Sequence, residues 1–474
     1  MKVRRLTGFC GLLALAACNF GESGVQPPNN RIFLPSALAV DPAGRWIYVL
    51  NSNSDLRFAA GTVVAVDEQA AARDRARTDW PACPRPSFLP PADNTQPLCC
   101  RDFFDSDTLN CDERPYINGG STVQIGSFGS NILAHPGSPE GGVGARRLFV
   151  SVRAEPSITF LDLQVGDEGV SMVCQEDGTP GGLCDDSHKV TGDRDTPGAL
   201  RLPEEPLAMA LDPELQALYV GHVRQGEGVS VIDLCPPTPT LVSATSEIFG
   251  EPGQGVTSLL LTQPGNPAAP IFATGQNPFR DFAAEVQKLV LRGGDLPCQG
   301  QPRPLAMVRG ESFFSSAFFT RGTDIRGLVF SPDGTRAYVL HRNGLSLSDP
   351  PALVAVDRTA DATGRPKNRA VAVVEMCAGA TQLLWHDAGR GPRLYGVCFE
   401  SGQIYIVDPD LMAVTAIINV GRGPALMSIS PVDRTRAYVA GFGDNNISVL
   451  DLSPDTRTEY RVVQRIGFPR LAGQ

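Results

Sequence analysis

Catalytic motifs are scarce in this chain, and histidine, the usual general acid or base, occurs only five times in 474 residues. The sequence has no H-E-x-x-H of a zinc hydrolase, no G-x-S-x-G nucleophile turn, no Walker phosphate loop and no G-x-G-x-x-G dinucleotide loop. It also lacks C-x-x-C-H, the attachment motif of c-type haem. We therefore expect no catalytic residue, no cofactor and no metal site.

Long apolar runs and an excess of basic residues are also absent. The apolar stretch 6–17 is far shorter than the ~20 residues that a bilayer-spanning helix needs. The formal net charge is −10, whereas surfaces that bind nucleic acid or anionic lipid headgroups are basic. The sequence therefore predicts no nucleic-acid partner, and any membrane attachment must come from something other than a helix or a basic surface.

The first residues supply another means of attachment. A basic start at residues 2–5 leads into the apolar stretch 6–17, which ends in Leu-Ala-Ala-Cys at Cys18. This order resembles a bacterial lipoprotein signal, in which the segment before the cysteine is removed and the cysteine is acylated. The resemblance implies a signal peptide at 1–17, a lipidated Cys18 and a polar tether at 18–30. A diacylated cysteine supplies the two chains that stable anchoring needs.

The residue after Cys18 bears on which membrane is used. It is Asn19, and not the Asp that retains enterobacterial lipoproteins at the inner membrane. We therefore expect a protein of the cell envelope, anchored in the outer membrane on its periplasmic or surface face. An ordinary signal peptide that happens to contain a cysteine is the alternative.

A strand pattern recurs along the rest of the chain. An apolar strand, a Pro/Asp/Gly turn, a strand with one aromatic residue and an alternating strand ending in Asp follow one another, most clearly over 425–451. Seven aromatic residues mark the copies: Tyr48, Phe149, Tyr219, Phe272, Tyr338, Tyr395 and Tyr438. The last two are 43 residues apart, and a period of ~40–45 residues is typical of a β-propeller blade. We predict an all-β fold, a seven-bladed β-propeller over 31–474.

Two copies resemble the YVTN-type β-propeller repeat. The resemblance is carried by Tyr438-Val439 followed by residues 444–451, and by Tyr219-Val220 followed by residues 229–233. The YVTN tetrapeptide itself is absent. The resemblance implies a propeller over most of 31–467, and it leaves the function open because propellers carry many activities.

The ends of the repeat and its longest spacings suggest how the ring closes. Residues 459–466 form a strand with no repeat after them, and little chain precedes Pro35 to give blade one an outer strand. We therefore expect 459–466 to be the outer strand of blade one, because this pairing would remove an exposed sheet edge. Pro-, Gly- and Asp-rich spacings at about 68–120 and 164–199 predict two loop insertions.

Ten cysteines remain once Cys10 and Cys18 are assigned to the signal. An even number in an exported chain favours disulfides. The repeat and the insertions suggest three pairs: Cys377–Cys398, Cys235–Cys298 and Cys174–Cys184. The first insertion would pair its four cysteines internally: Cys83, Cys99, Cys100 and Cys111. Zinc binding by these four is the alternative, although they lack paired C-x2-4-C spacing and a nearby histidine.

Acidic residues occur at two kinds of position. The third strand of most copies ends in an aspartate, and a repeated feature of this kind is expected to bond to the turn backbone: Asp67, Asp162, Asp233, Asp357, Asp408 and Asp451. The stretch 105–113 superficially resembles a calcium loop, but Leu109 stands where an oxygen ligand is needed and the loop glycine is missing. We therefore expect an ordinary solvated loop there.

The repeat also groups polar residues at one mouth of the central channel. The middle strand ends three residues after its aromatic marker, and the loops before the innermost strands reach the same face. Six polar residues are predicted there as a ligand face: Asn51, Glu205, His222, Arg326, His341 and Arg422. Ligands commonly bind in concave sites of this kind. The alternative is that these are solvated loop residues.

These observations favour a binding or scaffold protein over an enzyme. The leading expectation is a lipid-anchored envelope propeller that binds a protein or glycan partner. The alternative is a propeller enzyme of the lactonase or quinone-dependent dehydrogenase type, for which His341, His222 and Glu205 are the only acid–base candidates. A structural or assembly role is a third hypothesis.

Overall fold

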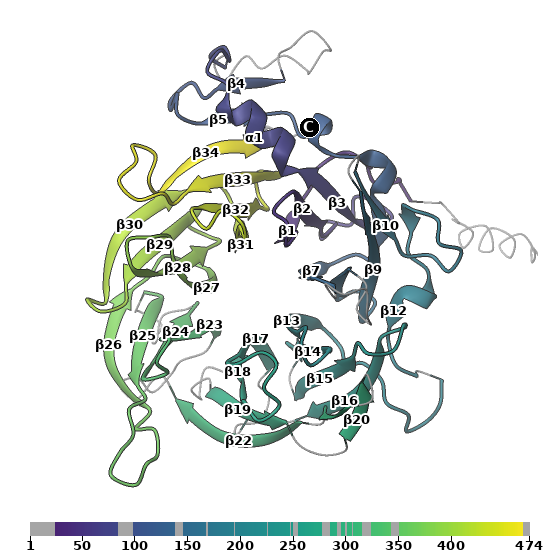
Figure 1. Ribbon diagram of the computed structural model, residues 1–474, viewed down its shortest axis with the longest axis vertical. Helices are drawn as coiled ribbons and strands as arrows, with labels where there is room; N and C mark the ends of the chain where they lie inside the picture. Colours follow the sequence, from purple (N-terminus) through teal and green to yellow (C-terminus); the bar gives the residue numbers. More distant parts are fainter. Residues whose placement is uncertain are drawn as a thin grey trace, which may run out of the picture.

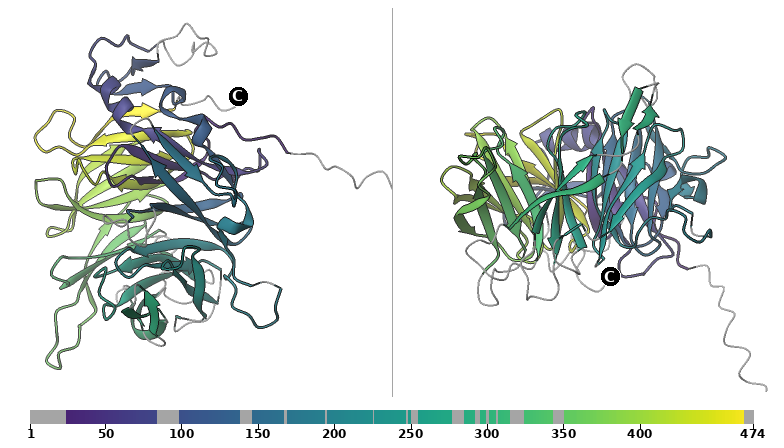
Figure 2. Two further views of the ribbon diagram at one scale, coloured as in Figure 1. Left: turned by 45° about the vertical axis from the view of Figure 1, so that its right-hand side comes forward. Right: turned by 90° about the horizontal axis from the view of Figure 1, so that it is seen from below.

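The computed structural model describes residues 24–83, 98–137, 146–166, 169–193, 195–224, 226–246, 248–249, 255–276, 285–291, 295–298, 301–305, 307–314, 324–342 and 350–467. The predicted signal peptide and Cys18 lie outside these residues. Within them the chain is almost entirely β-structure, and seven sheets surround a central channel (Figure 1). Each sheet has antiparallel strands that run through the thickness of the ring (Figure 2). The prediction of a seven-bladed β-propeller is confirmed.

Each blade is built from four principal strands. The innermost strands are β1 (Pro35–Val40), β7 (Gly129–His135), β13 (Pro206–Asp212), β17 (Gly255–Leu261), β23 (Ile325–Phe330), β27 (Ala380–Asp387) and β31 (Pro424–Ile429). The second strands are β2 (Trp46–Asn51), β8 (Arg147–Val152), β14 (Ala217–His222), β18 (Ile271–Gln276), β24 (Arg336–His341), β28 (Pro392–Cys398) and β32 (Arg436–Gly441).

The outer half of each blade follows in the same order. The third strands are β3 (Gly61–Asp67), β9 (Ser157–Val165), β15 (Glu227–Asp233), β19 (Glu285–Leu291), β25 (Ala352–Asp357), β29 (Gln403–Asp408) and β33 (Asn446–Asp451). The fourth strands are β6 (Val123–Ile125), β10 (Val170–Val173), β16 (Thr240–Ser246), β22 (Met307–Phe314), β26 (Arg369–Glu375), β30 (Ala413–Asn419) and β34 (Arg461–Ile466).

Short elements lie outside this plan. They are the helix α1 (Glu68–Ala76), the strands β4 (Cys99–Arg101), β5 (Leu109–Cys111), β11 (Gly182–Leu183), β12 (Lys189–Val190), β20 (Asp295–Cys298) and β21 (Gln301–Pro304), and the 3-10 turns η2 (Arg114–Tyr116), η3 (Gly119–Ser121) and η4 (Asp186–His188). All of them except β20 and β21 come from the two predicted insertions.

The seven aromatic markers form the core between blades. All lie on second strands, and each is at most 2% exposed. The Tyr338 hydroxyl donates to the Pro409 carbonyl at 3.2 Å and so reaches from blade five to the β29–β30 turn of blade six. A buried aromatic ring removes a large apolar area from water, which explains why one recurs in every blade.

The ring does not close as the sequence suggested. β34 pairs antiparallel with β33, so residues 461–466 are the outer strand of blade seven and not of blade one. Blade one instead takes its outer strand from β6, which pairs with β3 beyond the whole first insertion. The prediction was wrong because more than fifty residues separate β3 from the strand that completes its sheet.

The first insertion performs the closure itself. Its strand β5 pairs in parallel with β34, and β4 pairs with β5, so two strands from blade one extend the sheet of blade seven. This insertion lies outside β34 at the rim of the ring (Figure 1). The sequence predicted only a loop here, whereas the insertion begins with the helix α1. Asp67 caps this helix, because its carboxylate accepts the Ala70 N–H at 2.8 Å.

The other inserted segments also reach back to the preceding blade. β11, from the second insertion, pairs in parallel with β6 of blade one. The disulfide Cys235–Cys298 ties the β20–β21 hairpin, inserted in blade four, to the end of blade three. Each of these segments covers or fixes the outer end of its neighbour's sheet, where strand edges would otherwise be open.

Five disulfides account for the ten cysteines. They are Cys83–Cys100, Cys99–Cys111, Cys174–Cys184, Cys235–Cys298 and Cys377–Cys398. The last three coincide with the pairs proposed from the sequence, and the first two pair the four cysteines of the first insertion with one another. Three of the five hold the insertions in place.

Every innermost strand has a register shift near its start. The residues at the shift point into the channel, and we call them the bulge ring: Ser36, Ser130, Leu207, Thr257, Arg326, Thr381, and Ala425 with Leu426. A bulge leaves its extra residue unpaired and re-aims the side chain. Three hydroxyls of the ring therefore donate to the first carbonyl of the next innermost strand: Ser36 to Gly129 at 2.7 Å, Ser130 to Pro206 at 3.1 Å, and Thr257 to Ile325.

We expect these hydroxyls to join neighbouring blades. Ser36→Ala and Ser130→Ala should each lower the free energy of unfolding by about 1 kcal/mol, since each change leaves a carbonyl at a blade interface without its donor. The measurement is the midpoint of urea unfolding. Ser401→Ala is the control, because Ser401 lies exposed in a turn of blade six. Equal midpoints for all three variants would contradict the inter-blade role.

Candidate functional site

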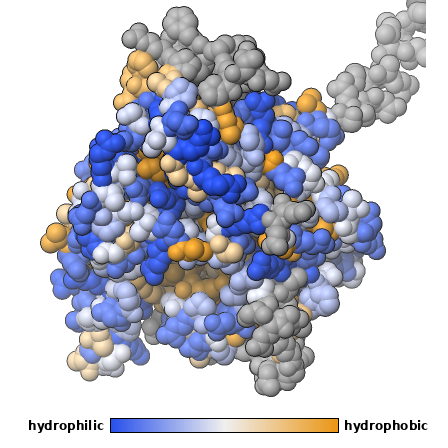
Figure 3. Space-filling view, turned by 45° about the horizontal axis from the view of Figure 1, so that its top comes forward, coloured by the Kyte–Doolittle hydropathy of each residue, from blue (hydrophilic) through white to orange (hydrophobic). Residues whose placement is uncertain are grey.

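The central channel contains a pocket of about 670 Å³. Residues from the innermost strands of all seven blades line it. Figure 3 shows one face of the ring, largely blue and white, with orange side chains in a hollow near its middle. Pockets of this size hold drug-sized ligands, usually between apolar walls with a few polar groups.

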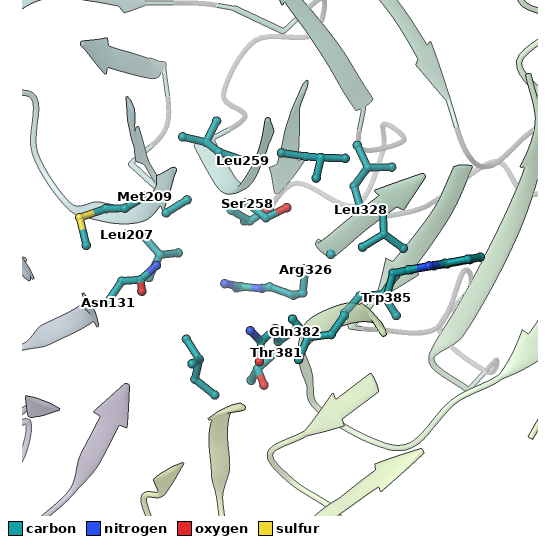
Figure 4. Close-up of a pocket in the computed structure, with 18 of the residues that line it drawn as sticks. Asn131, Leu207, Met209, Ser258, Leu259, Arg326, Leu328, Thr381, Gln382 and Trp385 are labelled. Carbon is teal, nitrogen blue, oxygen red and sulfur yellow. The ribbon is translucent and has the colours of Figure 1, made fainter. Parts of the chain in front are cut away.

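Arg326 is the one charged side chain among the described residues that line this pocket. It occupies the position in the bulge ring that holds a hydroxyl in blades one, two, four and six. Its guanidinium points toward the middle of the cavity (Figure 4). A cation aimed into a largely apolar pocket is the group most able to orient a ligand there.

One edge of the Arg326 guanidinium is already held by a carboxylate. Nε lies 2.8 Å from Oδ1 of Asp324, and Nη2 donates to Oδ2 of Asp324 at 2.9 Å. Burial raises the pKa of Asp324, and the nearby Arg326 opposes that rise. Asp324 is only 4% exposed, so it lies behind Arg326 and fixes the direction of the guanidinium.

Two amides that line the same pocket as Arg326 are oriented by backbone donors. The Oδ1 atom of Asn131 accepts the Ile132 N–H at 2.8 Å, and Oε1 of Gln382 accepts the Met427 N–H at 2.8 Å. An amide oxygen is the only part of either side chain that can accept a bond, so both NH₂ groups are left as donors. Both residues line the pocket, which therefore presents N–H groups from three blades.

Three of the six predicted mouth residues are buried inside their blades. Asn51 and His222 have no exposed surface and His341 has 1%. Asn51 donates to the Thr62 hydroxyl at 2.9 Å, and His222 Nε2 lies 2.9 Å from the Ser230 hydroxyl. Burial lowers the pKa of His222 to about 3 and that of His341 to about 4, so both are neutral at pH 7. They support the ends of blades one, three and five.

The other three mouth residues form ion pairs. Arg153 Nη2 lies 2.7 Å from Glu205 and joins blades two and three, while Nε of Arg422 lies 2.7 Å from Asp444 within blade seven. Of the six, only Arg326 lines the pocket. The sequence thus placed all six near the ends of the correct strands, but the structure does not bring them together as one ligand face.

The aspartates that end the third strands hold turns. Five of them accept backbone N–H groups two or three residues ahead, at 2.8–3.0 Å: Asp67, Asp233, Asp357, Asp408 and Asp451. Asp162 instead pairs with Arg147 at 2.5 Å. The expectation of a turn-bonding role holds for those five.

Neither a metal-binding group nor a membrane-spanning helix is found in the described part of the chain. No three His, Cys, Asp or Glu side chains there are grouped so that they could hold a metal ion. No helix among those residues is long and apolar enough to cross a membrane. In the stretch 105–113, residues Leu109–Cys111 form the strand β5, and Glu113 pairs with Arg31 at 3.0 Å.

Asn131 and Gln382 were missed in the sequence. Both stand next to the bulge position, one residue after Ser130 and Thr381 respectively. A Ser/Thr followed by an amide at the start of an innermost strand was the available signal. This pair of residues predicts an amide in the channel only when the register shift is known, because in an unshifted strand the amide would point toward the next blade.

The chain belongs to the class of seven-bladed β-propellers. No family model and no curated protein matches it. The hydrazine synthase of Kuenenia stuttgartiensis aligns with a TM-score of 0.51 and 13% identity, over 92% of this chain and 98% of that one. A candidate 6-phosphogluconolactonase from Bacteroides uniformis aligns at 0.47, with 13% identity over 83% and 87% of the two chains.

A third structure, the β-propeller domain of Cps50 (Swd1) from Myceliophteria thermophila, aligns with a TM-score of 0.39 and 12% identity, over 79% of this chain and 80% of that one. At such low identity, the likeness shows the fold and nothing about activity. The function therefore has to be argued from the residues of this chain.

Proposed function

We propose that this protein is a lipid-anchored propeller of the cell envelope that binds a protein partner and belongs among YVTN-type repeat proteins. The binding role rests on one observation, the uncovered strand edges at the outer rim of blades five and six. β26 and β30 are the last strands of their sheets, whereas β34 and β6 are each covered by a further strand of the chain.

Apolar side chains are exposed on these two outer strands. Val371 and Val373 on β26 are 50% and 40% exposed, and Ile417 on β30 is 45% exposed. An uncovered strand edge with apolar side chains is a template for another strand. The chain uses this pairing mode itself, because β5 adds in parallel to β34 and β11 adds in parallel to β6. An extended segment of a partner protein fits this rim better than a glycan does, since its backbone can continue the sheet.

The partner can be tested by crosslinking in cells followed by mass spectrometry. We expect one protein to crosslink near β26 or β30, and Val371→Asp with Ile417→Asp to remove it. Val432→Asp is the matched control, because Val432 is an exposed apolar residue in a turn of blade seven. No protein crosslink, together with turnover of a panel of lactones, would favour the enzymatic alternative.

The anchor is a separate prediction. Cys18→Ala should move the protein from the membrane fraction to the soluble periplasmic fraction and abolish incorporation of labelled palmitate, because acyl chains are the expected attachment. Cys10→Ala is the control and should leave both unchanged, since Cys10 lies within the segment that is removed. Membrane association that survives Cys18→Ala would refute lipid anchoring.

A further inference from the structure

The pocket in the channel presents donors of hydrogen bonds and no carboxylate among its described lining residues. Arg326 keeps one edge of its guanidinium for the cavity, because Asp324 occupies only Nε and one side of Nη2. The contact of Nη2 with Oε1 of Gln276 is long, at 3.5 Å. Nη1 has no protein partner in the part of the chain described. A guanidinium edge of this kind binds a carboxylate through two parallel bonds.

Apolar side chains surround this charged edge. Leu207, Met209, Leu259, Leu328 and Leu426 line the same cavity. In Figure 4, Arg326 extends between Ser258 on one side and Thr381 with Gln382 on the other, toward Leu207 and Asn131 across the cavity. The cavity combines apolar side chains on several sides with a small set of N–H donors, which suits a ligand with one charged end.

Three hydroxyls of the bulge ring do not donate to the cavity. Ser36, Ser130 and Thr257 donate their protons to carbonyls of the next blade, so these hydroxyls have no proton left to donate to a ligand. Nitrogen donors that face a ligand come from the NH₂ groups of Asn131 and Gln382 and from the free edge of Arg326. All three donate, and an acceptor with negative charge satisfies them best.

We propose that the central channel binds a small organic acid, whose carboxylate is held by Arg326 and the Asn131 and Gln382 amides and whose apolar body lies against the leucine-lined wall. The site goes beyond the proposed function, because it lies in the channel and not on the outer rim. The volume of about 670 Å³ admits a medium-chain carboxylate or an aryl-substituted one.

The test is titration calorimetry of the purified full-length chain with straight-chain monocarboxylates from butanoate to decanoate and with their primary amides. Each carboxylate is expected to bind at least about tenfold more tightly than its amide, because the amide lacks the charge that pairs with Arg326. Arg326→Gln should abolish this preference and leave the affinity for the amides unchanged. Arg422→Gln, which alters an arginine outside the pocket, should change neither.

Arg326→Gln leaves Asp324 buried without its cation, which can destabilise the fold. The double variant Asp324→Asn/Arg326→Gln keeps a neutral pair and should show the same loss of preference in a folded protein. Equal affinity for acids and amides, an undiminished preference in either variant, or no binding of any acid up to about 10 mM would overturn the proposal. None of these outcomes bears on the crosslinked partner, so the two proposals fail separately.

Discussion

Lowering the pH from 7.5 to 5 is expected to reduce the free energy of unfolding by about 4 kcal/mol. Burial lowers the pKa of His222 to about 3 and that of His341 to about 4, from an ordinary value of 6.5. Between these values the unfolded chain takes up protons that the folded chain does not. The contribution of these two histidines to the free energy of unfolding is therefore fully present well above pH 6.5. It is lost as the pH falls, by about 2 kcal/mol per histidine at pH 5.

The measurement is urea unfolding at pH 7.5, 6.5 and 5, and the readout is the slope of stability against pH. His222→Asn and His341→Asn should each remove a similar share of the slope, because the two lie in separate blades. The double variant should keep only the part due to His135, whose pKa burial also lowers. Asparagine is a suitable replacement, since Asn51 fills the same position in blade one and is fully buried there. A wild-type stability that stays constant between pH 7.5 and 5 would refute the prediction.

Removing the disulfide Cys235–Cys298 is expected to have a second large effect. This bond closes the longest loop of the five, with a sequence separation of 63 residues, and it joins blades three and four. In the chain-entropy account, a loop of this length corresponds to about 4 kcal/mol of stability, against about 3 kcal/mol for the 10-residue loop of Cys174–Cys184. Replacing both cysteines of each pair by alanine tests the ranking.

Burial predicts the opposite order, which makes the comparison informative. Cys174 and Cys184 are 0% and 2% exposed, whereas Cys298 is 9% exposed and Cys235 is half-buried. If lost packing dominated, Cys174→Ala/Cys184→Ala would be the less stable variant. We expect Cys235→Ala/Cys298→Ala to have the lower urea midpoint under non-reducing conditions. The reverse result would mean that the link between blades three and four adds little.

The sequence predicted the parts of the fold that repeat in every blade. A buried ring such as that of Tyr219 is needed in each copy, and so is an aspartate that caps a turn, such as Asp233, because each blade solves the same packing and hydrogen-bonding problem. The pairs of cysteines at blade ends followed from the same periodicity. These features depend only on position within a blade.

The closure of the ring was mispredicted because it depends on choices between neighbours. β34 and β6 are both short strands, and the sequence pattern alone does not say which sheet each one joins. The functional residues were mispredicted for the same reason, because their surroundings depend on neighbouring strands and blades. The histidines at 222 and 341 were correctly placed at strand ends, but their burial depends on the adjacent blade, and the orientation of Asn131 and Gln382 depends on a register shift that leaves no periodic trace.

The hairpin β4–β5 has a consequence for the order in which the protein folds. It follows β3 of blade one in the chain, so it is synthesised long before β34, whose Ile466 pairs with Cys111. Cys83–Cys100 and Cys99–Cys111 span only 17 and 12 residues, and local loops of that length close quickly. The hairpin can thus form its disulfides and fold early, so that its strand β5 is in place before β34 pairs with it. The strand β34 then completes the ring by inserting between β33 and β5, and β5 is the neighbour that formed first.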